Sequence, residues 1–253
     1  MTEKITTLKE KPRLKKEGKP FYNWLASPLG QLFLEQEAKE LLSLIHPLYG
    51  NNILCLGESP FLSGVNKSKL TDKIWLHPTQ AVPYEHGSVI CGRPDKLPIG
   101  DHEIDIVYLA HYLGSVQNPH EVLRESYRVL APEGHVVISG FNPWSLWGLK
   151  RFFGFLAPHW PWNTHFLSVA RLKDWLALLG FQWVSVRFYF FRPPFAAGLK
   201  KLQWMEGVGN TCWPIFGGHY LILAKKRVIP LTVFRPVWRP KAVKVEGLVG
   251  PAF

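Results

Sequence analysis

Residues 91–143 read CGRPDKLPIGDHEIDIVYLAHYLGSVQNPHEVLRESYRVLAPEGHVVISGFNP, and this stretch decides the fold. Residues 104–110, apolar apart from Asp105, and residues 136–138 are short runs of the kind that form buried strands. Between these runs, Asn118 can cap a helix and Pro119 suits its first position. A buried strand, an amphipathic helix and a second buried strand predict a parallel βαβ unit.

The rest of the chain repeats this pattern on both sides. Helices are predicted after Ser27-Pro28 and after Ser168, where apolar residues recur at helical spacing. Further strands are predicted at 53–56, 74–76, 89–91, 182–191 and 219–224. This alternation indicates an α/β fold with a mostly parallel sheet covered on both faces. Ligands of such sheets bind beyond the carboxyl ends of the strands.

Composition excludes several classes of protein. Of 253 residues, 47% are hydrophobic and 19% are charged, which excludes a largely disordered chain. The three cysteines are far apart, which excludes a disulfide framework and suits a reducing compartment. The histidines form no H-x-x-x-H pair, so we expect no metal site. No apolar run has the roughly 18 residues of a membrane span, and the N-terminus lacks the apolar core of a secretory signal. We therefore expect a cytoplasmic protein.

The positive charge lies at the two ends of the sequence. The net charge is +11, of which residues 1–20 carry +4 and residues 225–253 carry +6. We expect a basic N-terminal tail over 1–20, one folded domain over 21–227, and a basic C-terminal tail over 228–253. Such tails can contact nucleic acid or an anionic membrane surface, or can simply aid solubility.

The stretch at 91–143 resembles class I S-adenosylmethionine-dependent methyltransferases of the type 11 group. Those proteins typically read G-D-A-x-x-L-P-F, then F-D-x-V, H-x-L, D-P and L-x-E-x-x-R-V-L-x-P-G-G. The matching residues are Leu97, Pro98, Asp105, His111, Pro119, Leu123, Glu125, Arg128, Val129, Leu130, Pro132 and Gly134. The resemblance extends over residues 30–225 or so. It implies a Rossmann-like, seven-stranded sheet with helices on both faces, an antiparallel last strand, and S-adenosylmethionine as cofactor.

The cofactor-binding positions depart from the family pattern in three places. The glycine-rich D-x-G-x-G-x-G segment is replaced by residues 55–61, CLGESPF, which keep a single glycine and begin with Cys55. His77 stands where the family has a ribose-binding acid, and Arg93 stands near the adenine in place of Asp. The resemblance implies cofactor contacts at Gly57, Glu58, Ser59, His77, Arg93, Asp95, Leu97 and Ala110.

Two interpretations of these departures remain open. Glu58 and His77 can replace the missing groups, so that the cofactor binds in an altered way. Otherwise the site is lost, and the fold serves as a binding module for a partner, RNA or a membrane surface. If Gly57 passes close to the cofactor, Gly57→Val abolishes cofactor binding with a smaller effect on the stability of the free protein.

His111 ends the fourth predicted strand, on the active-site side of this fold. It is the candidate catalytic residue, because a histidine with a pKa near 7 can act as a general base or orient a nucleophile. The alternative is a helix-capping or core histidine.

Residues 141–167, FNPWSLWGLKRFFGFLAPHWPWNTHFL, hold four tryptophans, five phenylalanines and two charges. They form an aromatic cover packed on the core, a hydrophobic substrate pocket, or an interfacial helix with basic residues beside aromatic ones. Spacing predicts one helix, and we expect it to roof the pocket as a substrate lid made of Trp144, Trp147 and Phe152. Overall, the sequence predicts a methyltransferase acting on an unidentified hydrophobic or aromatic small-molecule acceptor.

Overall fold

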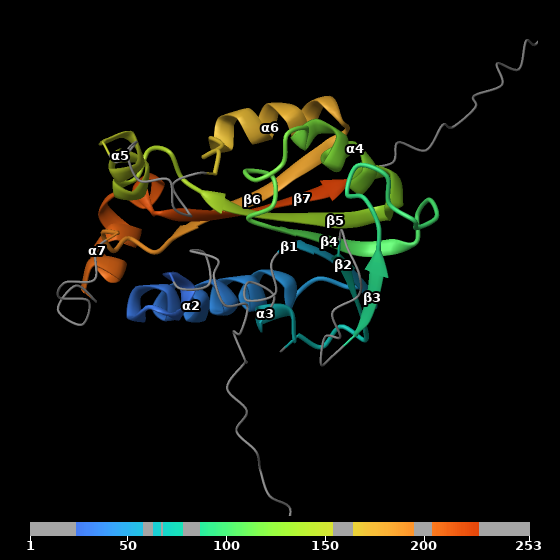
Figure 1. Ribbon diagram of the computed structural model, residues 1–253, viewed down its shortest axis with the longest axis horizontal. Helices are drawn as coiled ribbons and strands as arrows, with labels where there is room; N and C mark the ends of the chain where they lie inside the picture. The colour runs from blue at the N-terminus through green and yellow to red at the C-terminus, as the bar shows by residue number, and fades with distance from the viewer. Residues whose placement is uncertain are drawn as a thin grey trace, which may run out of the picture.

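The computed structural model describes residues 24–57, 63–66, 68–77, 87–153, 164–194 and 204–227 (Figure 1). The two basic tails predicted at 1–20 and 228–253 lie outside these residues, and so do Glu58 and Ser59. Contact of the tails with nucleic acid or with an anionic membrane therefore stays a prediction.

A single sheet of seven strands organises the described residues, in the order β3-β2-β1-β4-β5-β7-β6. Its strands are β1 Asn52–Gly57, β2 Asp72–His77, β3 Ser88–Cys91, β4 Ile104–Ala110, β5 Leu130–Phe141, β6 Phe181–Tyr189 and β7 His219–Lys226. Strands β1 to β5 pair in parallel, and β7 is antiparallel to both β5 and β6. The predicted Rossmann-like sheet, with one antiparallel strand, is confirmed.

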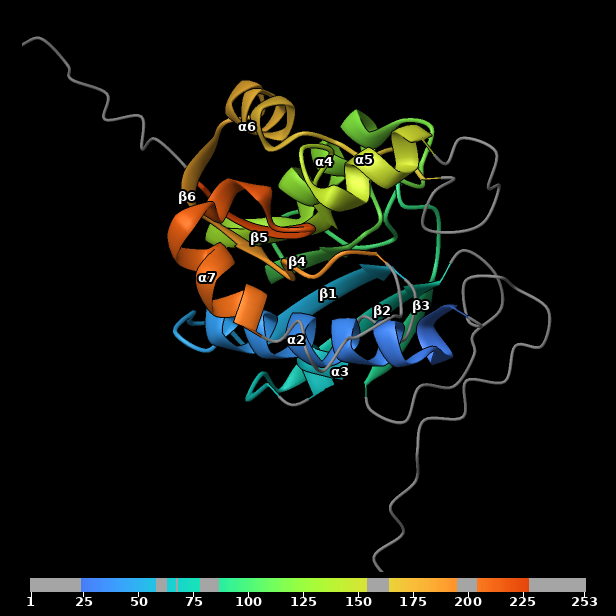
Figure 2. The same ribbon diagram turned by 90° about the vertical axis from the view of Figure 1, so that its left-hand side faces the viewer.

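Helices cover both faces of this sheet. They are α2 Pro28–Ile45, α3 Ser63–Asn66, α4 Pro119–Val129, α5 Leu146–Phe153, α6 Val169–Leu178 and α7 Trp204–Cys212, with a short 3-10 turn η2 Pro214–Phe216. Figures 1 and 2 show α2 and α3 under one face, and α4 and α6 over the other. Successive residues of a strand point to opposite faces, so Tyr108 of β4 joins the core under α2, and Leu109 joins the core under α4 and α6.

The helix starts follow the predicted capping chemistry in two cases out of three. Ser27 accepts a hydrogen bond from the Gly30 amide at 3.1 Å, and Ser168 accepts one from Arg171 at 3.3 Å. Asn118 makes no side-chain cap, because its ψ of 75° departs from the extended conformation of a capping residue. Helix α4 instead begins on Pro119 alone.

The L-P and E-x-x-R parts of the sequence motif form one structural lock. Arg128 of α4 donates to Leu97 O at 3.1 Å, Ile99 O at 3.0 Å and Asp101 Oδ1 at 2.6 Å. Glu125 accepts from Arg128 Nη2 at 2.8 Å and from the Leu97 amide at 3.1 Å. The hydrogen bond from Arg128 holds the pKa of Glu125 below its usual value, so the carboxylate stays ionised. These bonds fix the segment between β3 and β4 against the last turn of α4.

Candidate functional site

Three parallel strands end side by side at the carboxyl edge of the sheet. Gly57 of β1 pairs with Ala110 of β4, and Ala110 pairs with Ser139 of β5. His111 follows Ala110 directly. The register therefore brings the candidate catalytic residue beside the glycine that ends the first strand.

Gly57 is required by the packing of these strands. Its φ is +147°, a conformation that side chains rarely adopt. A Cβ at this position would lie 2.6 Å from the carbonyl oxygen of Ala110 and 2.7 Å from its methyl group. The expectation that Gly57→Val has a smaller effect on the free protein is therefore corrected. The substitution also disturbs the contact between β1 and β4 when no cofactor is bound.

Of the other positions that the resemblance implies, His77, Arg93, Asp95, Leu97 and Ala110 lie in the described part of the chain, and their contact with a cofactor stays a prediction. Cys55 is buried in the core, and burial raises the pKa of its thiol well above the usual value, so it cannot replace an ionised acid. Arg93 forms an ion pair with Asp95, with Arg93 Nε 3.0 Å from the carboxylate. The hydrogen bond from Arg93 holds the pKa of Asp95 below its usual value. His77 ends β2, and Leu97 is buried.

His111 is held from two sides. Its φ of 51° is uncommon for a residue with a side chain, and its amide donates to Ser139 Oγ at 3.0 Å. Its Nε2 lies 3.0 Å from Oε1 of Glu37 on α2, which also accepts from the Tyr108 hydroxyl at 3.0 Å. Both partners of the imidazole–carboxylate pair are almost fully buried. The pair is therefore rigidly placed at the end of β4.

Glu37 is the site residue that sequence reasoning missed. It lies between Phe33 and Leu41 at helical spacing, on the face of α2 that packs on the sheet. A charged residue at the centre of an apolar stripe was the available signal, since buried carboxylates occur almost only with partners.

A second histidine lies close to this pair. The ring of His219 is fully buried, 4.3 Å from the Phe33 ring and 5.8 Å from the His111 ring. Burial, and then the neighbouring His111, lowers the pKa of His219 well below its ordinary value. Neither of its ring nitrogens has a hydrogen-bond partner among the residues that the structure describes. His219 is therefore neutral in the folded protein.

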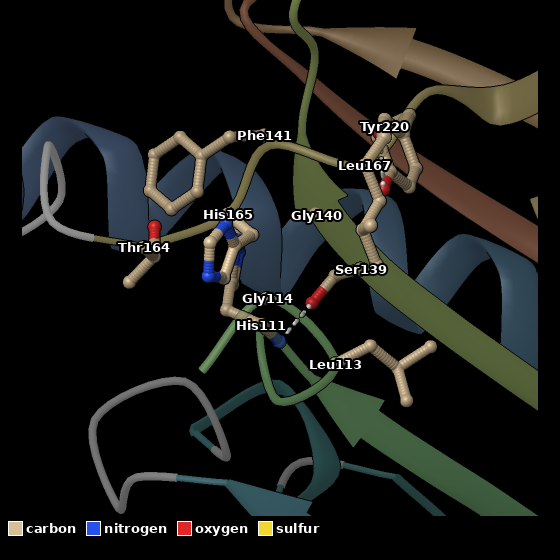
Figure 3. A pocket seen from close by; sticks show the side chains of 10 residues that line it. All are labelled: His111, Leu113, Gly114, Ser139, Gly140, Phe141, Thr164, His165, Leu167 and Tyr220. Carbon is tan, nitrogen blue, oxygen red and sulfur yellow. Dashed lines mark hydrogen bonds between the residues drawn. The ribbon is translucent and has the colours of Figure 1, made fainter. Parts of the chain in front are cut away.

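A small pocket opens at the carboxyl ends of β4 and β5 (Figure 3), where the figure shows the hydrogen bond between His111 and Ser139. The cavity itself has a volume of about 10 Å³, which is room for about one water molecule. Its lining is mixed, with polar side chains His111, Ser139, Thr164, His165 and apolar or aromatic side chains Leu113, Phe141, Leu167, Tyr220. An acceptor beside His111 would contact these residues and would require the pocket to widen.

Residues 141–167 form the aromatic connection between β5 and α6, and its described part has both buried and exposed aromatic side chains. Helix α5 forms close to where spacing predicts it. Trp147 is only 1% exposed and donates from Nε1 to Arg192 O at 2.9 Å. Trp147 is therefore a packing residue of the core, and the expectation that it lines a pocket is wrong. Trp144 and Phe152 are exposed, and their role as a lid stays a prediction.

The described part of the chain lacks both metal-binding clusters and membrane-spanning helices. It holds no group of three or more His, Cys, Asp or Glu side chains arranged to bind a metal ion. None of its helices combines the length and apolarity that a membrane crossing requires.

Comparison with known proteins places this geometry in a family. The profile of the family described as a methyltransferase domain matches residues 63–138. The uncharacterized protein YafS of Escherichia coli K12 is 31% identical over 210 residues, covering 83% of this chain and 82% of YafS. The mitochondrial 2-methoxy-6-polyprenyl-1,4-benzoquinol methylase of Xenopus laevis is 30% identical over 88 residues, which are 34% of this chain and 28% of the methylase.

Solved structures share the fold at low sequence identity. A SAM-dependent methyltransferase from Thermotoga maritima matches with a TM-score of 0.62 and 17% identity, over 82% of this chain and 94% of that chain. The [4+2]-cyclase SpnF matches with a TM-score of 0.54 and 17% identity, over 79% of this chain and 83% of that chain. The chain belongs to the same family as YafS. Residues 63–138 match the methyltransferase domain family, and the fold is that of class I S-adenosylmethionine-dependent methyltransferases.

Proposed function

We propose that this protein binds S-adenosylmethionine and methylates a small hydrophobic or aromatic acceptor held beside His111. The observation that carries the proposal is the Glu37–His111 pair, with its 3.0 Å contact. A buried imidazole–carboxylate pair contributes little to stability or lowers it. Groups of this kind, placed at the ligand-binding edge of a sheet, are typical of functional sites. A cytoplasmic location is part of the same proposal.

One side chain at the carboxyl edge fits the cofactor, because Asp95 supplies an ionised carboxylate after β3. Gly57 ends β1 there without a side chain, and a Cβ at this position would meet Ala110 and not an open space. By the resemblance, Glu58, Ser59, His77, Arg93 and Leu97 complete the site. S-adenosylmethionine supplies an electrophilic methyl group when it is bound.

His111 is proposed to take the proton that the acceptor loses. In this scheme Glu37 accepts from Nε2–H, which leaves the lone pair of the imidazole on Nδ1. The same carboxylate stabilises the imidazolium that forms when Nδ1 takes a proton. Ser139 holds the His111 backbone, so the base needs no reorganisation before it acts. Glu37 and Ser139 are positioning residues in this scheme.

The lining of the pocket and one relative support the proposed acceptor class. Phe141, Leu167 and Tyr220 give the pocket an apolar or aromatic wall, which suits a planar or aliphatic ligand. The Xenopus methylase is named for a polyprenyl benzoquinol, an aromatic acceptor with an apolar tail. We propose an acceptor of the same broad chemistry, with a hydroxyl or a comparable group directed at His111.

Thermal unfolding with S-adenosylmethionine and with its demethylated product tests the cofactor part. A ligand at a hundred times its dissociation constant stabilises by about 2.7 kcal/mol, which raises the midpoint of a domain of this size by roughly 5–10 °C. No shift with either compound at millimolar concentration contradicts the proposal.

The acceptor part is tested with labelled methyl groups and a panel of phenols and quinols. We expect Glu37→Gln to lower the rate at neutral pH by about 10- to 100-fold and to change its pH profile, because the tautomer of His111 is no longer fixed. The matched control is Glu35→Gln, an exposed position on the same helix. Equal rates and pH profiles in the two variants exclude the role of Glu37.

A second candidate function is a binding module without methyl transfer. The observations that favour it are Cys55, a neutral buried thiol at the acidic position, and Arg93, whose charge is balanced by Asp95. SpnF, named as a cyclase, has the same fold, so the fold alone does not decide the reaction. The thermal test separates the two functions, since the module gives no shift with either compound.

A further inference from the structure

Helix α5 presents three apolar side chains to solvent, and its two cations also contact the protein. Leu146, Leu149 and Phe152 recur at intervals of three residues and are exposed. Lys150, one turn after Leu146, is exposed although its Nζ donates to Pro194 O at 2.6 Å, and the Arg151 guanidinium lies 5.1 Å from the Phe166 ring centre. The three exposed apolar side chains depart from the arrangement expected for a surface helix in water.

Further exposed apolar residues lie next to this helix. The Trp144 amide donates to Asn142 Oδ1 at 3.1 Å, and Asn142 Nδ2 donates to Ile215 O at 2.7 Å and to Gly217 O at 2.9 Å. Asn142 thus joins the start of α5 to the η2 turn. We define the α5–η2 surface by its exposed members, Trp144, Leu146, Leu149, Phe152, Trp213, Ile215 and Phe216. Figure 2 shows α5 and α7, which η2 follows, at the end of the molecule that faces the viewer.

The surface is large for a protein that stays in water. Trp144 is 72% exposed, Phe152 is 78% exposed and Ile215 is 62% exposed. Since an aromatic side chain can bury about 150–250 Å², Trp144 and Phe152 alone expose about 300 Å² of mostly apolar area. An exposed apolar patch of this size marks an interaction site.

The charges around the surface select its partner. Residues 141–153 and 207–220 contain no Asp or Glu, whereas Lys150 and Arg151 lie on α5, and most of the net positive charge of the chain lies in residues 1–20 and 225–253. A second copy of this chain would bring the same cations to this surface, and no carboxylate from these two segments to pair with them. Aromatic and aliphatic side chains beside basic ones match the interface of an anionic bilayer, where apolar groups enter the acyl boundary and cations contact headgroups.

We propose that the α5–η2 surface docks this protein on membranes that contain anionic phospholipids. Phe141 and Thr164, which line the pocket, lie close in sequence to both ends of the aromatic connection, so docking would bring the pocket near the bilayer. The proposal does not depend on methyl transfer, and a protein without catalytic activity would still bind vesicles.

Vesicle flotation of the full chain tests it. The probes are vesicles of phosphatidylcholine alone and of phosphatidylcholine with about one third phosphatidylglycerol. We expect preferential binding to the anionic vesicles, and we expect the double variant Trp144→Ser, Phe152→Ser to bind them at least about 30-fold more weakly. Both side chains are mostly exposed, so the variant should keep the circular dichroism and the unfolding midpoint of the parent.

The matched control is the double variant Tyr49→Ser, Leu178→Ser. These side chains are 96% and 84% exposed, and they lie just before β1 and β6, at the opposite edge of the sheet. We expect this control to bind vesicles like the parent. Measurement at about 0.5 M salt screens the contribution of the basic tails and leaves the apolar contribution.

Three outcomes overturn the proposal. One is equal binding by the two double variants at high salt, and another is equal binding of the parent to both kinds of vesicle at low salt. The third is a dimer of the parent that the Trp144→Ser, Phe152→Ser variant converts to a monomer, which would assign the surface to a second copy of the chain.

Discussion

At the scale of single residues, the joint between Gly57 and Ala110 limits what can change at the site. A Cβ at Gly57 meets backbone oxygen at 2.6 Å with φ at +147°, so we expect Gly57→Ala to lower the free energy of unfolding by about 2–4 kcal/mol. The control is Gly207→Ala in α7, where a Cβ meets nothing within 4 Å and helix propensity favours alanine. Urea unfolding of both variants measures the difference, and a neutral Gly57→Ala contradicts the packing argument.

The same scale shows why part of the candidate site was not predicted from the sequence. His111 was predicted because it ends a recognisable strand, but its partner Glu37 lies 74 positions away on α2. No local pattern links two residues that meet only when a helix packs on a sheet. The position of Trp147 was predicted wrongly for the same reason, since its indole is buried against Arg192 O and the rings of His219 and Phe190.

At the scale of elements, Arg128 joins α4 to the segment that follows β3. We expect Arg128→Lys to cost about 1–2 kcal/mol, because a single ammonium cannot serve Leu97 O, Ile99 O and two carboxylates together. Hydrogen exchange of the Leu97 and His102 amides should become faster, while the amides of β1 change little.

The matched control for that change is Arg124→Lys, an exposed arginine on the same helix. We expect it to leave both the unfolding free energy and the exchange at Leu97 unchanged. Equal changes in unfolding free energy and in Leu97 amide exchange in the two variants would show that Arg128 stabilises this segment no more than an exposed arginine does.

The elements themselves were largely predictable. Every predicted run lies within or overlaps one of β1 to β7, although most strands also contain polar or charged residues. Helices α2 and α6 begin at the predicted serine caps because that chemistry is local. Asn118 makes no cap, since its φ of −118° and ψ of 75° lie outside the extended conformation of a capping residue. The carboxyl-edge location of the site followed from parallel topology, and only the side-chain partners required the structure.

At the scale of the whole molecule, the two faces of the sheet differ in character. The core under α4 and α6 contains Tyr220, and the buried Lys226 of β7 donates from Nζ to Tyr127 O and Leu130 O on that side. The core under α2 contains Glu37, Tyr108, Tyr189 and His219. The buried carboxylate and the buried imidazoles thus lie on the face of the sheet that holds the proposed base, which makes stability depend on pH there.

His219 sets the first part of that dependence. Its pKa in the folded protein is well below the ordinary value of 6.5, so the unfolded chain binds a proton first as the pH falls. Stability is therefore fully present above about pH 6.5 and decreases below it, by up to about 2 kcal/mol at about pH 5, since one pH unit is worth about 1.4 kcal/mol per proton. Hydrogen bonds from basic partners lower the pKa of Asp95, Asp101, Glu125 and Glu133.

Acid unfolding should consequently proceed in two stages that respond to different changes. The stage between about pH 6.5 and 5 belongs to His219. We expect His219→Phe to remove most of it, whatever the variant does to stability at pH 7.5, while exposed His46→Gln leaves it in place. The stage below about pH 4 belongs to the paired carboxylates, and salt should weaken it because those pairs lie near the surface. Urea unfolding at a series of pH values measures both stages. If His219→Phe and the parent lose equal stability between pH 6.5 and 5, the buried imidazole is not the group that titrates, and another histidine such as His135, whose pKa is lowered by burial, takes its place.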